Sequence, residues 1–166
     1  MKKIHLLTGP VHTGKTTRLM HWASSQKSID GIFQPVIDEK RFIYYIASRT
    51  LKMLESPSNS LDEKVIKIGN YRFSKDVFIW AQNVLLISLD KNLEWLIIDE
   101  IGPLELAGSG LEPVITKIFA DSEKFSRKIL CVVRDSILEK FIEHYKLENK
   151  YELIKFILFL ILIFPF

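Results

Sequence analysis

Residues 9–16 combine two glycines, a lysine and a threonine at the spacing of a phosphate-binding loop. The segment reads Gly9-Pro10-Val11-His12-Thr13-Gly14-Lys15-Thr16 and fits the P-loop pattern G-x-x-x-x-G-K-[ST] at each fixed position. Gly9 and Gly14 permit backbone conformations that are closed to other residues, so that amide N–H groups can turn inward around a phosphate chain. A helix that starts near Gly14 would favour the same anion through its dipole. The motif therefore predicts a triphosphate site.

The side chains of this loop have separate expected tasks. Lys15 would reach the β- and γ-phosphates, and the Thr16 hydroxyl would be a ligand of the accompanying Mg²⁺. An ordinary glycine-containing turn is the alternative, but the apolar run before the motif and the amphipathic pattern after it favour the phosphate site. The predicted nucleotide-binding residues are Gly9, Pro10, Val11, His12, Thr13, Gly14, Lys15, Thr16 and Thr17.

Two adjacent carboxylates, Asp99 and Glu100, follow the apolar run Leu96-Ile97-Ile98, as in a Walker B element. On a strand neighbouring the strand of the P-loop, Asp99 would hold Mg²⁺ from the side opposite Thr16. Glu100 would point elsewhere, because side chains alternate along a strand, and would orient or deprotonate the attacking water. An acidic strand end that faces solvent is the alternative, and a P-loop in the same chain disfavours it.

A further candidate, Arg134, follows the apolar run 129–133 and would lie at the sheet edge where α/β proteins bind ligands. It could contact the γ-phosphate or form a surface salt bridge with Asp135 or Glu139. Glu105 could contact a ligand or hold the loop after Glu100 in shape. The predicted catalytic residues are Lys15, Glu100 and Arg134, and the predicted metal ligands are Thr16 and Asp99.

Alternating apolar runs and amphipathic segments predict an α/β fold with a mostly parallel sheet flanked by helices. Helices are expected over 16–27, 74–89 and 111–120, and from a capping box at Ser136–Glu139 to Tyr145. Buried strands are expected at 4–7, 93–98 and 128–133. Four short strands, 32–37, 41–46, 65–68 and 71–73, would form an antiparallel insertion over 31–72, with Pro35 marking an edge or bulged strand.

The 166 residues fit one domain over 1–152 and an apolar tail over 153–166, of which the tail would contain a last strand and an overhang. The tail is too short to span a bilayer, so membrane association is not expected. A net charge of +3 without a basic block gives no sign of nucleic-acid binding. The single cysteine, Cys131, is expected to be buried in a protein of the reducing cytoplasm. The oligomeric state stays open, a monomer included.

The run Asp99-Glu100-Ile101-Gly102-Pro103-Leu104-Glu105-Leu106 resembles the D-E-I-G-P-x-E-L signature of a small nucleoside-triphosphatase family, which includes the cancer-related nucleoside-triphosphatase and its thermophile relatives. The order of motifs is similar too, over about residues 2–145. The interior of the P-loop departs from the commoner Pro-Gly-Val/Ile-Gly. This resemblance implies a RecA-like P-loop fold, dependence on Mg²⁺, and hydrolysis of several nucleoside triphosphates to the diphosphate and phosphate.

Two other functions fit the same residues. In a small-molecule or nucleotide kinase, Glu100 would serve a substrate hydroxyl instead of water. In a nucleotide-dependent switch or assembly factor, slow hydrolysis would control a partner protein. No element that would select a particular base is visible in the sequence.

Overall fold

The computed structural model describes residues 2–10 and 12–155. Five parallel strands form the centre of the main sheet. In spatial order they are β10 (Tyr151–Lys155), β1 (Ile4–Gly9), β9 (Lys128–Arg134), β8 (Trp95–Ile101) and β2 (Ile29–Phe33). The predicted α/β fold with a mostly parallel sheet is confirmed. The predicted last strand is present at Tyr151–Lys155, and the rest of the predicted tail, 156–166, lies outside the described residues.

Antiparallel strands extend this sheet beyond β2. Strand β4 (Lys40–Tyr45) pairs with β2, with β3 (Val36–Ile37) and with β5 (Thr50–Met53). The predicted antiparallel pairing of 32–37 with 41–46 is therefore present. The range 32–37 is interrupted, since it falls partly on β2, an internal strand, and partly on β3, a strand at the edge of the sheet. Pro35 falls in the break between β2 and β3, where no N–H is required and its carbonyl still accepts a hydrogen bond from Phe42 N–H at 2.9 Å.

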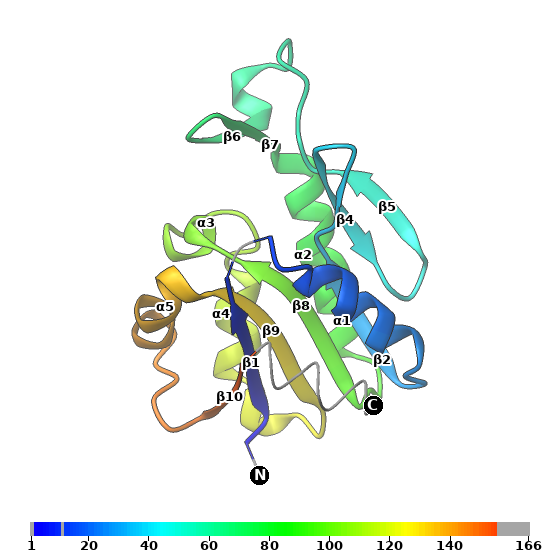
Figure 1. Ribbon diagram of the computed structural model, residues 1–166, viewed down its shortest axis with the longest axis vertical. Helices are drawn as coiled ribbons and strands as arrows, with labels where there is room; N and C mark the ends of the chain where they lie inside the picture. The colour runs from blue at the N-terminus through cyan, green and yellow to red at the C-terminus, as the bar shows by residue number, and fades with distance from the viewer. Residues whose placement is uncertain (1, 11, 156–166) are drawn as a thin grey trace.

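A separate two-stranded hairpin, β6 (Val65–Ile68) and β7 (Tyr71–Ser74), follows a short 3₁₀ helix (Asp62–Lys64). Figure 1 shows this hairpin, together with β4 and β5, at the end of the molecule toward which β1 and β8 run. The insertion between β2 and the next helix therefore stands over the carboxyl edge of the parallel strands.

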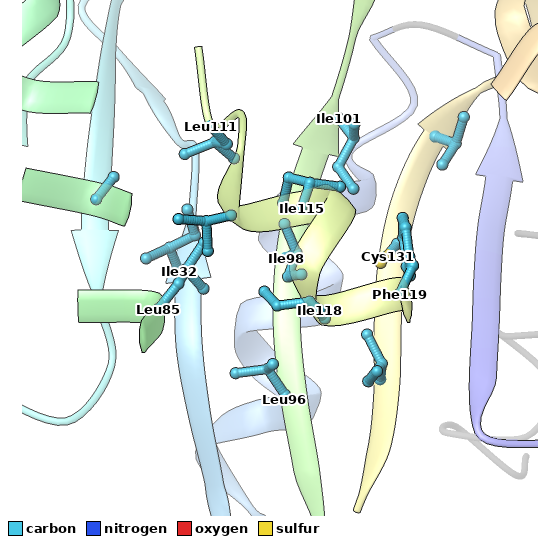
Figure 2. Packing of buried hydrophobic residues seen from close by; sticks show 14 of the residues in the cluster. Ile32, Leu85, Leu96, Ile98, Ile101, Leu111, Ile115, Ile118, Phe119 and Cys131 are labelled. Atoms are coloured by element: carbon cyan, nitrogen blue, oxygen red, sulfur yellow. The ribbon is translucent and has the colours of Figure 1, made fainter. Parts of the chain in front are cut away.

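Helices cover both faces of the sheet unequally. One face packs against α2 (Lys75–Leu89), α4 (Val114–Ala120) and α5 (Leu138–His144), as Figure 2 shows for part of this core. The other face packs against α1 (Lys15–Ser24). Cys131 is fully buried on β9, as predicted. A short helix, α3 (Pro103–Leu106), follows β8.

Helix α2 begins with a side-chain cap that the sequence analysis did not identify, whereas the helix start with the predicted capping box has none. Ser74 caps α2, because its hydroxyl accepts a hydrogen bond from Val77 N–H at 3.3 Å. The capping box predicted at Ser136 is wrong, since a 3₁₀ helix occupies Asp135–Ile137 and α5 begins at Leu138 without a side-chain cap. The tighter 3₁₀ turn removes Ser136 from the N-cap position. A further 3₁₀ helix lies at Ser122–Lys124.

Candidate functional site

Three parallel strands deliver the predicted site residues to one edge of the sheet. β1 ends at Gly9, β9 ends at Arg134, and β8 ends beyond Asp99 and Glu100. The sequence interpretation placed the carboxylate strand directly beside β1, and this is wrong, because β9 lies between β1 and β8. Local sequence patterns do not specify which parallel strands are neighbours. Because β9 lies between β1 and β8, Arg134 lies between the P-loop and the Asp99-Glu100 pair, in register with Gly9.

The P-loop joins β1 to α1 by a left-handed turn. Gly14 has φ +76° and ψ 23° at the N-cap of α1, a conformation that a residue with a Cβ adopts at a cost. Gly9 has a different role from the one expected, because it is the last residue of β1 and is extended. Gly14 thus supplies the conformational freedom that this loop requires.

The ammonium of Lys15 is folded back onto its own loop. Its Nζ donates hydrogen bonds to the carbonyl of Gly9 at 2.9 Å and to that of Pro10, and lies 3.4 Å from the Thr13 hydroxyl. Burial lowers the pKa of Lys15, while the carboxylates of Asp135, Glu100 and Asp99 oppose this shift. The loop therefore surrounds a cation with oxygen acceptors that a phosphate could replace.

Asp99 is fully buried and only half satisfied. Its Oδ2 accepts a hydrogen bond from Gln34 N–H at 3.0 Å, whereas its Oδ1 has no hydrogen-bond partner among the described residues. Burial raises the pKa of Asp99 to about 6, although the Gln34 N–H, the nearby Thr16 hydroxyl and the Lys15 ammonium favour the charged form. An unpaired buried carboxylate oxygen is costly unless a ligand completes it.

Glu100 leaves the strand in another direction because the backbone is irregular there. Its φ is +58°, and the pairing of β8 with β9 shifts register between Ile98 and Ile101. The Oε1 atom of Glu100 accepts hydrogen bonds from Nε of Arg134, at 3.2 Å, and from its Nη2. Oε2 accepts from Nη1 of Arg41 at 3.3 Å. Arg134 thus pairs with the predicted catalytic carboxylate, and not with Asp135 or Glu139 as in the alternative prediction.

Glu105 holds the loop that follows Glu100. Its side chain is 3% exposed, and its two oxygens accept hydrogen bonds from Gly102 N–H at 2.8 Å and Leu111 N–H at 3.1 Å. Burial raises the pKa of Glu105 to about 7 despite these two hydrogen bonds. Of the two roles expected for Glu105, the structure shows the one that shapes the loop.

These groups line one cavity of about 820 Å³. Six of the predicted nucleotide-binding residues lie on its wall, namely His12, Thr13, Gly14, Lys15, Thr16 and Thr17, together with Asp99, Glu100 and Arg134. Gly9 and Pro10 are not part of this wall, but their carbonyls accept hydrogen bonds from Lys15 Nζ, and Val11 lies outside the described residues. The structure therefore brings the predicted catalytic and metal-binding residues to one space, where their roles stay predictions.

Sequence reasoning missed three residues of this cavity, Gln34, Arg41 and Tyr71. Gln34 fixes the end of β8 through its backbone N–H and through its Nε2, which donates to the carbonyls of Asp99 at 3.0 Å and Glu100 at 3.2 Å. Each belongs to the insertion, and the sequence analysis assigned none of them a role in binding or catalysis. Only their position across the cavity from the P-loop identifies them.

The oxygens at this site fit a hard divalent cation that is shared with a phosphate. Mg²⁺ prefers oxygen ligands and is commonly held by one or two carboxylates plus substrate phosphates. The Oδ1 of Asp99, unpaired among the residues that the structure describes, and the nearby hydroxyl of Thr16 supply such a partial set. Over 2–10 and 12–155, no group of three or more His, Cys, Asp or Glu residues is arranged to hold a metal. Thr16 and Asp99 would thus need phosphate or water oxygens to complete the coordination.

A parallel sheet with a P-loop after β1 and an acidic pair near the end of β8 defines a nucleotide-binding protein of the P-loop class. Residues 4–158 match the family described as NTPase, and the chain belongs to that family. The fold is similar to the crystal structure of THEP1 from the hyperthermophile Aquifex aeolicus, with a TM-score of 0.69 and 18% identity over 92% of this chain and 88% of that one.

No curated protein matches this chain. Among the described residues, no helix has the length and apolar character needed to cross a membrane.

Proposed function

We propose that this protein hydrolyses nucleoside triphosphates, ATP and GTP among them, to the diphosphate and phosphate in a reaction that depends on Mg²⁺. The observation that carries the proposal is the buried Oδ1 of Asp99, which has no hydrogen-bond partner in the described part of the chain and lies in the cavity that also contains Lys15 and Glu100. Membership of the NTPase family supports it. The single cysteine of the protein, Cys131, is buried and unpaired, which suits the reducing cytoplasm, where we place this activity.

Each residue has a distinct role in this proposal. The loop amides and Lys15 bind the phosphates, and Thr16 and Asp99 hold Mg²⁺, which when bound neutralises charge on the β- and γ-phosphates. Glu100 orients a water for in-line attack on the γ-phosphorus and accepts its proton, while the bond to the bridging oxygen breaks and the diphosphate leaves. Arg134 keeps Glu100 in place and adds positive charge beside the γ-phosphate.

Phosphate release from a panel of common nucleoside triphosphates, with and without Mg²⁺, tests this function. Lys15→Ala is expected to lower turnover on the order of a hundredfold or more, because it removes the cation that stabilises the transferring phosphoryl group. Lys27→Ala is the matched control, since it removes the same charge at an exposed position beyond the other end of α1. Unchanged release in Lys15→Ala would contradict the proposal.

The same assay separates hydrolysis from its two rivals. A kinase should release little phosphate until a hydroxyl-bearing acceptor is added. A slow switch should show very low turnover, while Glu100→Gln traps the triphosphate and retains a protein partner on pull-down. Mg²⁺-dependent release from the triphosphate alone therefore favours hydrolysis over both.

A further inference from the structure

Arg41 reaches the site from the insertion and not from the parallel sheet. Its backbone N–H donates to Glu55 Oε1 at 3.1 Å, which anchors this part of β4. Its side chain is 19% exposed, and its Nη1 lies 3.3 Å from Glu100 Oε2. The guanidinium carbon lies 5.3 Å from the centre of the Tyr71 ring, a cation–π distance. Arg41 therefore links strand β4, the β6–β7 hairpin and the predicted catalytic carboxylate.

The two arginines hold Glu100 with unequal contacts. Arg134 uses two nitrogens on Oε1 and extends from β9, in the middle of the parallel sheet. Arg41 makes one contact, at 3.3 Å, to the other oxygen. A single long contact is weaker than a two-point one. Of the two guanidinium groups, that of Arg41 can leave Glu100 at the lower cost.

In this arrangement both oxygens of Glu100 accept hydrogen bonds from guanidinium groups. These hydrogen bonds oppose the binding of an attacking water to the carboxylate. A γ-phosphate placed by Lys15 and Thr16 would enter the same cavity with more negative charge than a carboxylate. Arginine binds phosphate oxygens well because its donors form a planar fork. The triphosphate itself is thus a suitable competitor for the guanidinium of Arg41.

We propose that Arg41 is a catalytic arginine carried by the insertion, which Glu100 holds before substrate arrives and which moves to the γ-phosphate of a bound triphosphate. This move frees Glu100 Oε2 for the attacking water, while Arg134 keeps its hold on Oε1. Tyr71 is a positioning residue, since its ring supports the guanidinium from the β6–β7 hairpin. The inference rests on the proposed function and adds substrate-dependent activation of the same site.

Equilibrium binding tests the exchange without any turnover. The ligands are ADP and an imido-bridged, non-hydrolysable ATP analogue, each with Mg²⁺. Arg41→Ala is expected to weaken binding of the analogue about tenfold, the effect of one charge-assisted contact, and to leave ADP binding unchanged. Glu100→Gln is expected to tighten binding of the analogue, because its neutral amide no longer competes for Arg41. Equal weakening of both ligands in Arg41→Ala would overturn the proposal.

The double variant Glu100→Gln/Arg41→Ala supplies the sharper result. If the two side chains compete as proposed, the gain in affinity caused by Glu100→Gln disappears when Arg41 is absent. A gain that persists in the double variant would mean that Glu100 repels the phosphate directly, and the exchange would be wrong. These arms stay decisive if no hydrolysis is found, so failure of this inference and failure of the proposed function can be told apart.

Turnover then tests the catalytic role. Arg41→Ala is expected to lower kcat about a hundredfold, because it removes a positive charge from the transition state. Lys40→Ala is the matched control: it is the exposed neighbour on β4 and lies outside the cavity wall. Tyr71→Ala should lower kcat with little effect on KM, and Tyr71→Phe, which keeps the ring, should restore it. An unchanged or raised kcat in Arg41→Ala would overturn the role, provided that circular dichroism shows the fold intact.

Discussion

The end of β8 and the short helix α3 each bury a carboxyl group, and the two groups have opposite patterns of hydrogen bonding. Asp99 is fully buried and Glu105 is 3% exposed, and burial raises the pKa of both, to about 6 and about 7. Glu105 satisfies both oxygens with backbone N–H groups. Asp99 satisfies one oxygen and leaves the other without a partner among the described residues.

This difference shows that a raised pKa does not by itself identify a functional carboxylate. Burial alone accounts for the direction of both shifts, whether the group binds a ligand or shapes a loop. The informative observation is the oxygen that the protein does not satisfy, since a buried acceptor left unpaired has an energetic cost. This criterion supports the proposal that Asp99 binds the metal, and it identifies Glu105 as a residue that holds the neighbouring loop.

The largest expected effect comes from exchanging each carboxylate for its amide. We expect Asp99→Asn to lower Mg²⁺-dependent phosphate release on the order of a thousandfold, because an anionic metal ligand is lost. Its amide oxygen can still accept the hydrogen bond from Gln34, so the fold should remain. Glu105→Gln is the matched control, and its turnover should stay within about tenfold of wild type.

Binding of the metal with ADP separates the two variants further. In the presence of ADP, Mg²⁺ should raise the unfolding temperature of wild type and of Glu105→Gln. The unfolding temperature of Asp99→Asn with ADP should not rise when Mg²⁺ is added. Equal losses of turnover and of Mg²⁺ stabilisation in both variants would contradict the division between site and support.

The local part of this site was predictable from the sequence, and the long-range part was not. The P-loop and the Asp99-Glu100 pair each depend on a few consecutive residues, whose spacing carries the signal. The position of β9 between β1 and β8 depends on strand pairing across many residues, which no local period encodes. The predicted adjacency of β1 and β8 failed for this reason.

The insertion shows the same limit at single residues. Its hairpins were predicted from short apolar runs and turn residues, and they are present. Arg41, however, begins an ordinary strand-like run, and Gln34 precedes a proline, so neither has a local pattern of its own. Their contacts with Asp99 and Glu100 arise only when the insertion lies over the sheet edge.

The next largest expected effect is a change in the free energy of unfolding with pH, caused by the titration of Glu105. Its pKa in the folded protein, about 7, lies above its ordinary value of 4.5, so the folded state holds a proton that the unfolded chain has released. The stabilising contribution of this proton is complete below about pH 4.5 and is lost as pH rises through about 7. The shift corresponds to about 3 kcal/mol.

Urea unfolding of wild type and Glu105→Gln across this pH range measures that contribution. The free energy of unfolding of wild type, relative to the variant, should fall as pH rises, because the amide does not titrate. A difference in the free energy of unfolding between the two proteins that stays constant from about pH 4.5 to above pH 7 would show that Glu105 does not cause the pH dependence.

The smallest expected effect is the loss of stability when a Cβ is added beside the Glu105 side chain. Gly108 and Gly110 have positive φ, +74° and +67°, but a Cβ at Gly108 would meet open space, whereas one at Gly110 would lie 2.3 Å from Glu105 Oε1. Gly108→Ala should therefore cost about 1 kcal/mol from backbone strain alone. Gly110→Ala should cost roughly 1–2 kcal/mol more, because it displaces a carboxylate from its backbone donors.

A double-variant cycle assigns that additional cost to Glu105. In a Glu105→Ala background the carboxylate oxygen is absent, so Gly110→Ala and Gly108→Ala should destabilise the protein equally in urea unfolding. If Gly110→Ala remains the more costly change there, the collision lies with Leu104, whose Cβ would be 3.3 Å away, and not with Glu105. Turnover of both single variants should stay close to wild type. The atoms nearest to a Cβ at either glycine belong to neither Asp99 nor Lys15, and the oxygen proposed to receive the metal is on Asp99.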